Sequence, residues 1–185
     1  MKKKILVCAF IAVCLSLVAY STTAYFTYED TAQNIITMGN IKIELQQLQN
    51  GILTPGEEAI DILPGTQVQK TVQVKNAGEH DAWIRISVTE TIALLNGTIN
   101  ETDSSLINYD LNTEDWIEKD GYYYYTSSLA PNETTKPLFT EIRFSEQMGN
   151  AYQQSKAYIK VSAQATQMIH NGETVWDAAG WPAAE

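Results

Sequence analysis

Few side chains in this sequence have the chemistry that catalysis usually needs. The two histidines, His80 and His170, stand alone in Gly-Glu-His-Asp and Ile-His-Asn-Gly stretches, which favour turns. The chain has no His-Glu-x-x-His pair to bind zinc and no Gly-x-Ser-x-Gly elbow around a serine nucleophile. We therefore predict surface turns for both histidines, no catalytic residue, no metal site and no cofactor. Only a Ser-His-acid triad scattered along the chain stays open.

A run of carboxylates is the second candidate for chemistry. Its members are Asp110, Glu114, Asp115, Glu118 and Asp120. Calcium loops bring carboxylates together at tight alternating spacing around a glycine, and this run lacks that spacing. We favour a solvated acidic face over a calcium site.

Four consecutive tyrosines, Tyr122 to Tyr125, form the third candidate. In a strand, Tyr122 and Tyr124 share one face, and Tyr123 and Tyr125 share the other. One pair can fill a core while the other lies on the surface. We name Tyr123 and Tyr125 as the candidate surface pair, which would stack on sugar rings or hold a partner protein. The alternative is a β-favouring strand that the acidic excursion covers.

The elements that would position these residues are strands, because apolar and polar residues alternate along most of the chain. Ile41 and Ile43, for example, flank Lys42. Turn dipeptides such as Pro64-Gly65 separate the alternating runs. The pattern predicts an all-β fold, an antiparallel β-sandwich or jelly roll, as a single domain over residues 37–185. The expected strands cover residues 40–48, 66–76, 82–89, 138–144 and 151–167, with a long polar excursion and one helical turn at about 90–118.

The N-terminal 24 residues have the layout of a secretory signal peptide. Three lysines, Lys2-Lys3-Lys4, precede an apolar run over residues 5–20 and then small side chains. Thr22 and Ala24 occupy the −3 and −1 positions of the cleavage site, so the exported chain would begin at Tyr25. The segment itself would be a signal helix in front of the β domain.

Other interpretations of the N-terminal segment have less support. A membrane anchor needs about 20 apolar residues, and the run has 16. A lipoprotein signal needs a small residue before its cysteine, whereas valines precede Cys8 and Cys14. We therefore predict a secreted bacterial protein that meets the membrane only through its signal before cleavage.

The charge of the chain excludes some partners. It has 22 acidic and 12 basic side chains, a formal net charge of −10. Removal of residues 1–24 takes away three lysines and leaves −13. Nucleic acid and anionic lipid both attract basic surfaces. We expect neither as a partner.

The sequence from the cleavage site onward resembles the TasA/camelysin family of exported bacterial biofilm-matrix proteins. The resemblance begins at Ala24-Tyr25-Phe26-Thr27, a small-residue cut before an aromatic pair, and spans nearly the whole chain. Its later part is similar to a clostridial-type branch that is exported through a dedicated signal peptidase. The other matching segments are residues 34–43, 63–68, 72–78, 83–86, 115–116, 120–125, 129–131 and 134–139.

The resemblance implies a jelly-roll subunit of extracellular fibres. In that family the freed N-terminal segment is a donor strand that completes a sheet of the next subunit. Here the donor would be residues 25–36, with Tyr25, Phe26 and Tyr28 as anchors. The implied partners are the signal peptidase and a second copy or related matrix subunit, at the cell surface or in the biofilm matrix.

Two alternative functions stay open. One is a cell-surface binding module for a glycan or protein that uses the surface tyrosines. The other is a metallopeptidase, which the camelysin name implies. Because the sequence has no zinc motif, no catalytic residue carries over, and we expect a protein that is not an enzyme.

Overall fold

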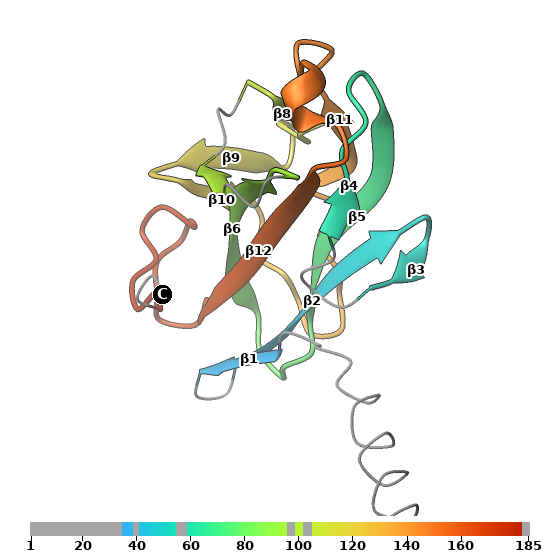
Figure 1. Cartoon of the computed structure of the whole chain (residues 1–185). Coiled ribbons are helices and arrows are strands. Elements are labelled where there is room, and N and C mark those ends of the chain that lie inside the picture. Colours follow the sequence, from blue (N-terminus) through green and yellow to red (C-terminus); the bar gives the residue numbers. More distant parts are fainter. Residues whose placement is uncertain (1–34, 39–40, 55–58, 96–98, 102–104, 183–185) are drawn as a thin grey trace, which may run out of the picture. The chain divides into compact units, whose positions relative to one another are not determined.

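The computed structural model describes residues 35–38, 41–54, 59–95, 99–101 and 105–182. All of them belong to one compact unit, Ala32–Glu185. Figure 1 labels their elements, which follow one another as β1 (Ile35–Met38), β2 (Ile41–Gln49), β3 (Ile52–Leu53), β4 (Ala59–Asp61), β5 (Gln67–Asn76), β6 (Ala82–Ala93), β7 (Ile99–Glu101), β8 (Ile107–Tyr109), β9 (Trp116–Lys119), β10 (Tyr122–Tyr125), β11 (Phe139–Phe144), the 3₁₀ helix η1 (Asn150–Tyr152) and β12 (Lys156–Gln167).

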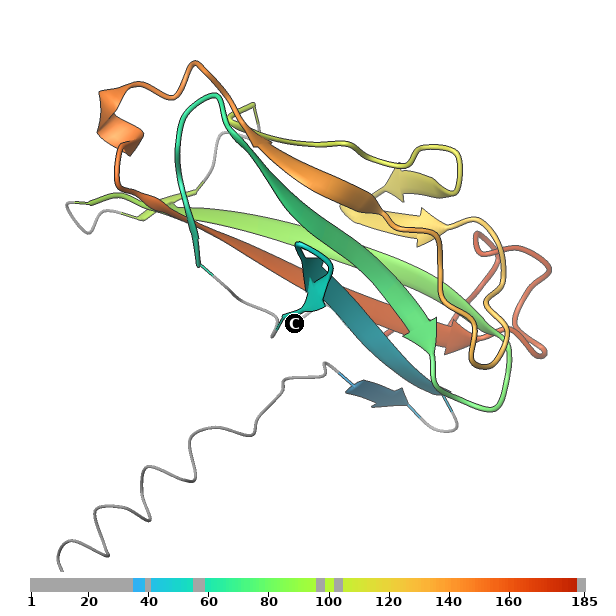
Figure 2. The ribbon, with the colours of Figure 1, turned by 90° about the vertical axis from the view of Figure 1, so that its right-hand side faces the viewer.

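The strands form two antiparallel sheets. The first, sheet A, has the order β1-β2-β5-β11-β8, and β3 also pairs with β2. The second, sheet B, has the order β4-β12-β6-β10-β9, and β7 also pairs with β6. The two longest strands, β6 and β12, pair along their whole length and lie side by side in both views (Figures 1 and 2). The predicted antiparallel β structure is therefore confirmed for the described residues.

One hydrophobic core joins the two sheets. Strand alternation turns every second side chain inward, and the inward set of both sheets belongs to a single buried cluster. The expected faces of the strands at residues 40–48 and 66–76, and the apolar face of the strand at 82–89, are confirmed. The buried members include Ile43, Leu45, Val72, Val74 and Ile142 from sheet A, and Ile84, Ile86, Ile92, Ile159 and Val161 from sheet B.

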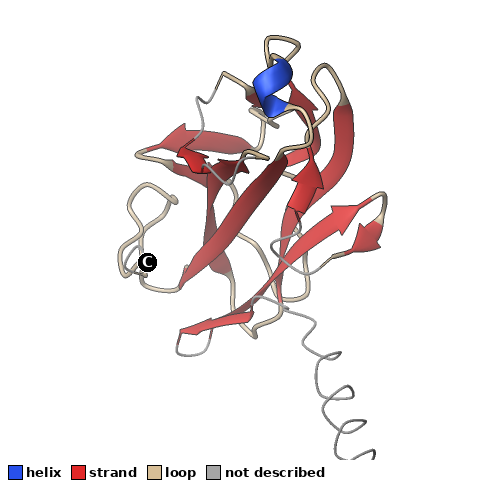
Figure 3. Ribbon diagram, in the orientation of Figure 1, coloured by secondary structure: helices blue, strands red, loops and turns tan. Residues whose placement is uncertain are grey.

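Two expected elements differ from the structure. The strand expected from residue 151 begins at Lys156, because the 3₁₀ helix η1 and a turn at Ser155 precede it. In the excursion at 90–118, the described residues form mostly strand, namely the end of β6 and the short strands β7, β8 and β9. A single hydrogen-bonded turn at residues 112–116, in which the Trp116 amide donates to the Asn112 carbonyl, matches the one expected helical turn. Figure 3 shows η1 as the only helical element of the described residues.

Two polar residues are buried on the inward face of β5. The Asn76 side chain donates hydrogen bonds to the carbonyls of His80 and Leu129 and accepts one from the Gly78 amide, with lengths of 2.8, 2.8 and 2.9 Å. The bonds with His80 and Gly78 form the turn after β5, and the bond to Leu129 joins this turn to a segment remote in sequence. Lys70, with 1% of its surface exposed, lies in register opposite Gln49.

Candidate functional site

The residues predicted from the signal peptide lie outside the described part of the chain. These are the cleavage positions Thr22, Ala24 and Tyr25, and the anchors Phe26 and Tyr28. The first described element after them, β1, pairs with the start of β2.

The prediction that Tyr123 and Tyr125 form a surface pair is wrong, because both face the core. Tyr125 is only 9% exposed, its ring centroid lies 5.0 Å from that of Trp116, and its hydroxyl accepts a hydrogen bond from the Lys136 amide. Tyr123 is half-buried and packs against the same core cluster. Neither residue can therefore present a free aromatic face to a ligand.

The other tyrosine pair, Tyr122 and Tyr124, lies on the outer face of sheet B. Register pairs there align side chains from four strands in one row, in the order Ile117, Tyr124, Arg85 and Gln164. Tyr124 is also buried, because residues 168–182 fold back over this face and bury it in a second cluster with Trp83 and Val175. Both faces of β10 are therefore covered, at least in part.

Arg85 is the residue that ties this outer face together. Its guanidinium donates to the side-chain oxygens of Gln164 and Tyr124 and to the Pro182 carbonyl, with lengths of 2.8, 3.2 and 3.2 Å. Its Cζ atom lies 3.9 Å from the Tyr122 ring centroid and 4.7 Å from that of Trp181. These are cation–π distances, so Arg85 fastens the C-terminal segment to the sheet.

Sequence reasoning did not find this cluster. Alternation placed Arg85 on the solvent-facing side of its strand, as it does for most charged residues. The available signal for an aromatic cluster was that Trp83 lies two residues before Arg85, on the same strand face. Two more tryptophans, Trp176 and Trp181, follow late in the sequence.

The C-terminal segment, residues 168–182, is itself held by hydrogen bonds. The Asn171 side chain donates to the Thr166 hydroxyl and to the Ala179 carbonyl, and it accepts a bond from the Ala179 amide. Gly172 has φ +87°, and a Cβ atom there would lie 2.8 Å from Cβ of Asp177. The loop therefore needs glycine at this position.

One edge of sheet B, along β12, is only partly paired among the residues that the structure describes. On one side of β12, all 12 residues pair with β6. On its other side, β4 pairs only with residues 156–158. Among the residues that the structure describes, no strand pairs with positions 159–167 on that side. Such an edge presents unpaired N–H and C=O groups that can add a further strand.

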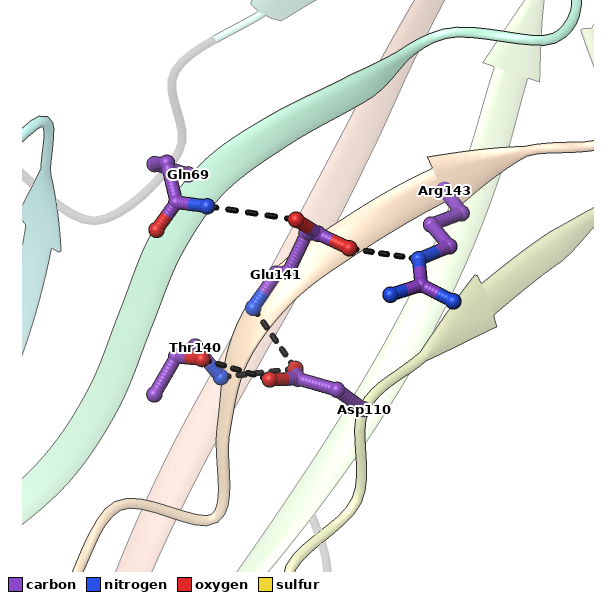
Figure 4. A network of polar contacts seen from close by, with 5 residues as sticks. All are labelled: Gln69, Asp110, Thr140, Glu141 and Arg143. Carbon is purple, nitrogen blue, oxygen red and sulfur yellow. Dashed lines mark hydrogen bonds and ion pairs between the residues drawn. The ribbon is translucent and has the colours of Figure 1, made fainter.

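A polar network joins β5, β8 and β11 on sheet A (Figure 4). The Asp110 carboxylate accepts bonds of 2.8 Å from the Thr140 amide, 2.5 Å from its hydroxyl and 2.6 Å from the Glu141 amide, where the register of β11 shifts. Burial alone would raise the pKa of Asp110, but these bonds outweigh it and hold the pKa below its ordinary value. Glu141 in turn accepts from Gln69 at 3.2 Å and Arg143 at 2.5 Å.

The network gives Asp110 a structural role and separates it from the other carboxylates of the acidic run. Asp115, another member, accepts a bond of 2.9 Å from the Asn112 side chain. Within the described ranges, no three His, Cys, Asp or Glu side chains lie close enough together to hold a metal ion. The histidines His80 and His170 lie exposed in turns, as predicted.

A partly buried carboxylate lies between the sheets. Glu90 on β6 faces Tyr109 on β8, and burial raises the pKa of the Glu90 carboxyl above its ordinary value. Burial and the charge of Glu90 also raise the pKa of Tyr109, whose buried hydroxyl has no hydrogen bond of normal geometry.

In the part of the chain that the structure describes, no helix is long and apolar enough to span a bilayer. Comparison with family models, with curated proteins and with solved structures found no match.

Proposed function

We propose that this chain is a secreted, non-enzymatic subunit of an extracellular bacterial matrix or fibre. In this proposal, the signal peptidase cuts after Ala24, and the freed N-terminal segment of one copy adds to β12 of the next copy. The observation that carries the proposal is that, among the described residues, no strand pairs with β12 at residues 159–167 on the side away from β6. The resemblance of the sequence to TasA-type matrix proteins, and the two antiparallel sheets around one core, agree with it.

The lengths of the two segments match. Among the described residues, nine positions of β12 have no partner strand on this side, and a strand rises about 3.3 Å per residue, so this stretch is about 30 Å long. The chain between Tyr25 and the start of β1 at Ile35 has ten residues. It can therefore cover the edge in extended form before the chain enters its own sheet.

The side chains of the two segments are also compatible. Ile159, Val161, Ala163 and Ala165 of β12 point into the core. A strand beside them directs alternate residues the same way. Phe26 and Tyr28 share one face of the donor, so two of the three predicted anchors would point inward. Tyr25 and Thr27 would lie on the outer face, Thr27 beside Ser162.

Strand addition between copies gives a polymer. The donor and the acceptor are different surfaces, so the contact is head-to-tail, and such a contact generates a filament when it does not close. Cleavage acts as the switch, because a donor that is still joined to the membrane-inserted signal cannot reach the edge of a neighbour.

Electron microscopy of secreted protein tests this function. Cells that express the full chain should release protein that begins at Tyr25 and forms fibres. Two matched variants should give monomers: one with extra residues retained before Tyr25, and one that lacks residues 25–30. Monomers from the native start over a range of pH and protein concentration would contradict the proposal, and so would fibres from the deletion variant.

A further inference from the structure

The tip of the β2–β3 hairpin carries an asparagine in a chemically reactive setting. Asn50 and Gly51 form the two-residue turn, and their φ angles of +51° and +79° are those of a type I′ turn. Both residues are exposed. Their only hydrogen bond with the rest of the described chain is a long one, 3.4 Å from the Asn50 amide to the Gln69 carbonyl. The Asn50 carboxamide and the Gly51 nitrogen are therefore in solvent and not tied to other described groups.

These two groups can react with each other. The Gly51 nitrogen, once it has lost its proton, attacks Cγ of Asn50 and expels the side-chain nitrogen as ammonia, which closes a five-membered succinimide ring. Water then opens the ring at either carbonyl and leaves aspartate or isoaspartate. The reaction consumes only water and involves no change of oxidation state. Glycine after the asparagine favours the ring, because it has no Cβ atom to hinder the attack.

The structure describes one other Asn-Gly pair, Asn171-Gly172, and there the fold opposes this reaction. The Asn171 side-chain nitrogen donates bonds of 2.9 Å to the Thr166 hydroxyl and to the Gln167 and Ala179 carbonyls. The side-chain oxygen accepts a bond of 2.8 Å from the Ala179 amide. The carboxamide must give up these bonds before it can turn toward the Gly172 nitrogen, and each lost bond costs free energy. The two Asn-Gly pairs therefore differ in how firmly the fold holds the reacting side chain.

The turn at Asn50-Gly51 holds β3 in place. A two-residue turn fixes the register of its hairpin, which here sets Gln49 opposite Ile52 and Leu48 opposite Leu53. Isoaspartate carries the chain through its side-chain carbon, so it adds one backbone atom to the turn and shifts this register. Among the described strands, β3 pairs only with β2, and both of its side chains are exposed. Little else in the described chain therefore keeps β3 at the edge of sheet A once the turn has changed.

We propose that Asn50 is a site of spontaneous deamidation, and that the isoaspartate formed there releases β3 from the edge of sheet A. The reaction replaces a neutral amide with a carboxylate, so the modified chain also gains one negative charge at the hairpin tip. Release of β3 leaves the backbone of β2 at Leu48 and Gln49 without its partner on that side. The modification lies on sheet A and not at the edge of β12, so it does not depend on strand addition between copies.

Peptide mapping by mass spectrometry tests the site, with protein recovered from expression of the full chain and aged at mildly alkaline pH. Asn50 should deamidate at least about tenfold faster than Asn171, a ratio equivalent to 1.4 kcal/mol, because Asn171 must first lose its hydrogen bonds. The rate at Asn50 should rise with pH, since the attacking nitrogen must lose a proton. In urea, which unfolds both turns, the protection of Asn171 should disappear. Equal rates at the two sites in the folded protein, or a preference for Asn50 that persists in urea, would overturn the proposal.

Hydrogen exchange of the Thr54 amide tests the release of β3, because this amide donates a bond of 2.8 Å to the Gln47 carbonyl at the end of the hairpin. Ageing should speed the exchange in the wild type. It should not do so in Asn50→Gln, whose longer side chain needs a less favourable six-membered ring. Freshly purified Asn50→Asp has the charge of the product without the added backbone atom, so its Thr54 amide should exchange like that of fresh wild type. Exchange that ageing leaves unchanged in the wild type, or fast exchange in fresh Asn50→Asp, would overturn release by isoaspartate.

Discussion

Replacement of Arg85 should release the C-terminal segment from sheet B and lower the stability of the whole unit. Arg85→Ala removes three hydrogen bonds and two close ring contacts. Hydrogen bonds contribute about 0.5–1.5 kcal/mol each and cation–π contacts about 0.5–1 kcal/mol each. Because Arg85 is half-buried and its contacts are lost together, we take a value low in the summed range, about 3 kcal/mol.

The predicted loss is large enough to measure in two ways. For a unit of this size, about 3 kcal/mol corresponds to a fall in melting temperature of about 6–12 °C. Urea unfolding gives the free energy directly, and Arg85→Lys should cost about half as much, because lysine keeps the charge but not the planar fork. Limited proteolysis should cut the variants within residues 168–182 before the core.

A matched control decides whether the contacts of Arg85 explain the effect. Lys42→Ala removes an exposed cation from β2 and should change stability by less than about 0.5 kcal/mol. The reasoning would be refuted if Arg85→Ala were no more destabilising than Lys42→Ala, or if the C-terminal segment stayed as resistant to protease as in the wild type.

Three further substitutions test other contacts. Asp110→Asn should cost about 1 kcal/mol at pH 7. The folded protein lowers the pKa of Asp110. The stability that the Asp110 carboxylate gives the fold is therefore fully present at pH values above its ordinary pKa of about 3.9, and it is lost as pH falls through the folded pKa. The deficit in urea unfolding should therefore vanish at low pH. Glu90→Gln should stabilise the protein at pH 7 but not at pH 3, because a raised folded pKa means stability that is lost as pH rises. Gly172→Ala should lower the free energy of unfolding more than Gly51→Ala, because a Cβ atom at Gly172 clashes with Asp177, whereas at Gly51, with φ +79°, the Cβ position is empty. Equal losses would mean that only backbone strain, which both positions share, destabilises the two variants.

Much of the fold could be predicted because alternation is a local property. Ile41 and Ile43 on β2, and Val72 and Val74 on β5, lie on the buried faces that their spacing indicates. Alternation assigns side chains to two faces, but it does not say which face is inside. For Tyr125 and its neighbours that choice depends on sheet B and on the C-terminal segment, which are remote in sequence.

The candidate sites were harder to predict for the same reason. The outer cluster joins Arg85 with Gln164 and Pro182, which are 79 and 97 residues away, so no local pattern connects them. Among the described residues, positions 159–167 of β12 have no second partner strand because β4, as described, has only three residues. Strand length of that kind depends on the turns at either end and not on the alternating pattern.

Disulfide trapping is the most direct test of strand addition between copies. Protein that begins at Tyr25 has no natural cysteine, because Cys8 and Cys14 precede the cut. Thr27→Cys and Ser162→Cys in one chain should give a ladder of covalent multimers on oxidation, since neighbouring strands place paired side chains about 4.5–5.5 Å apart. Thr27→Cys with Leu95→Cys, at an exposed position outside β12, should give none. Disulfides only within single chains, or the same ladder from the control pair, would contradict assembly through the β12 edge.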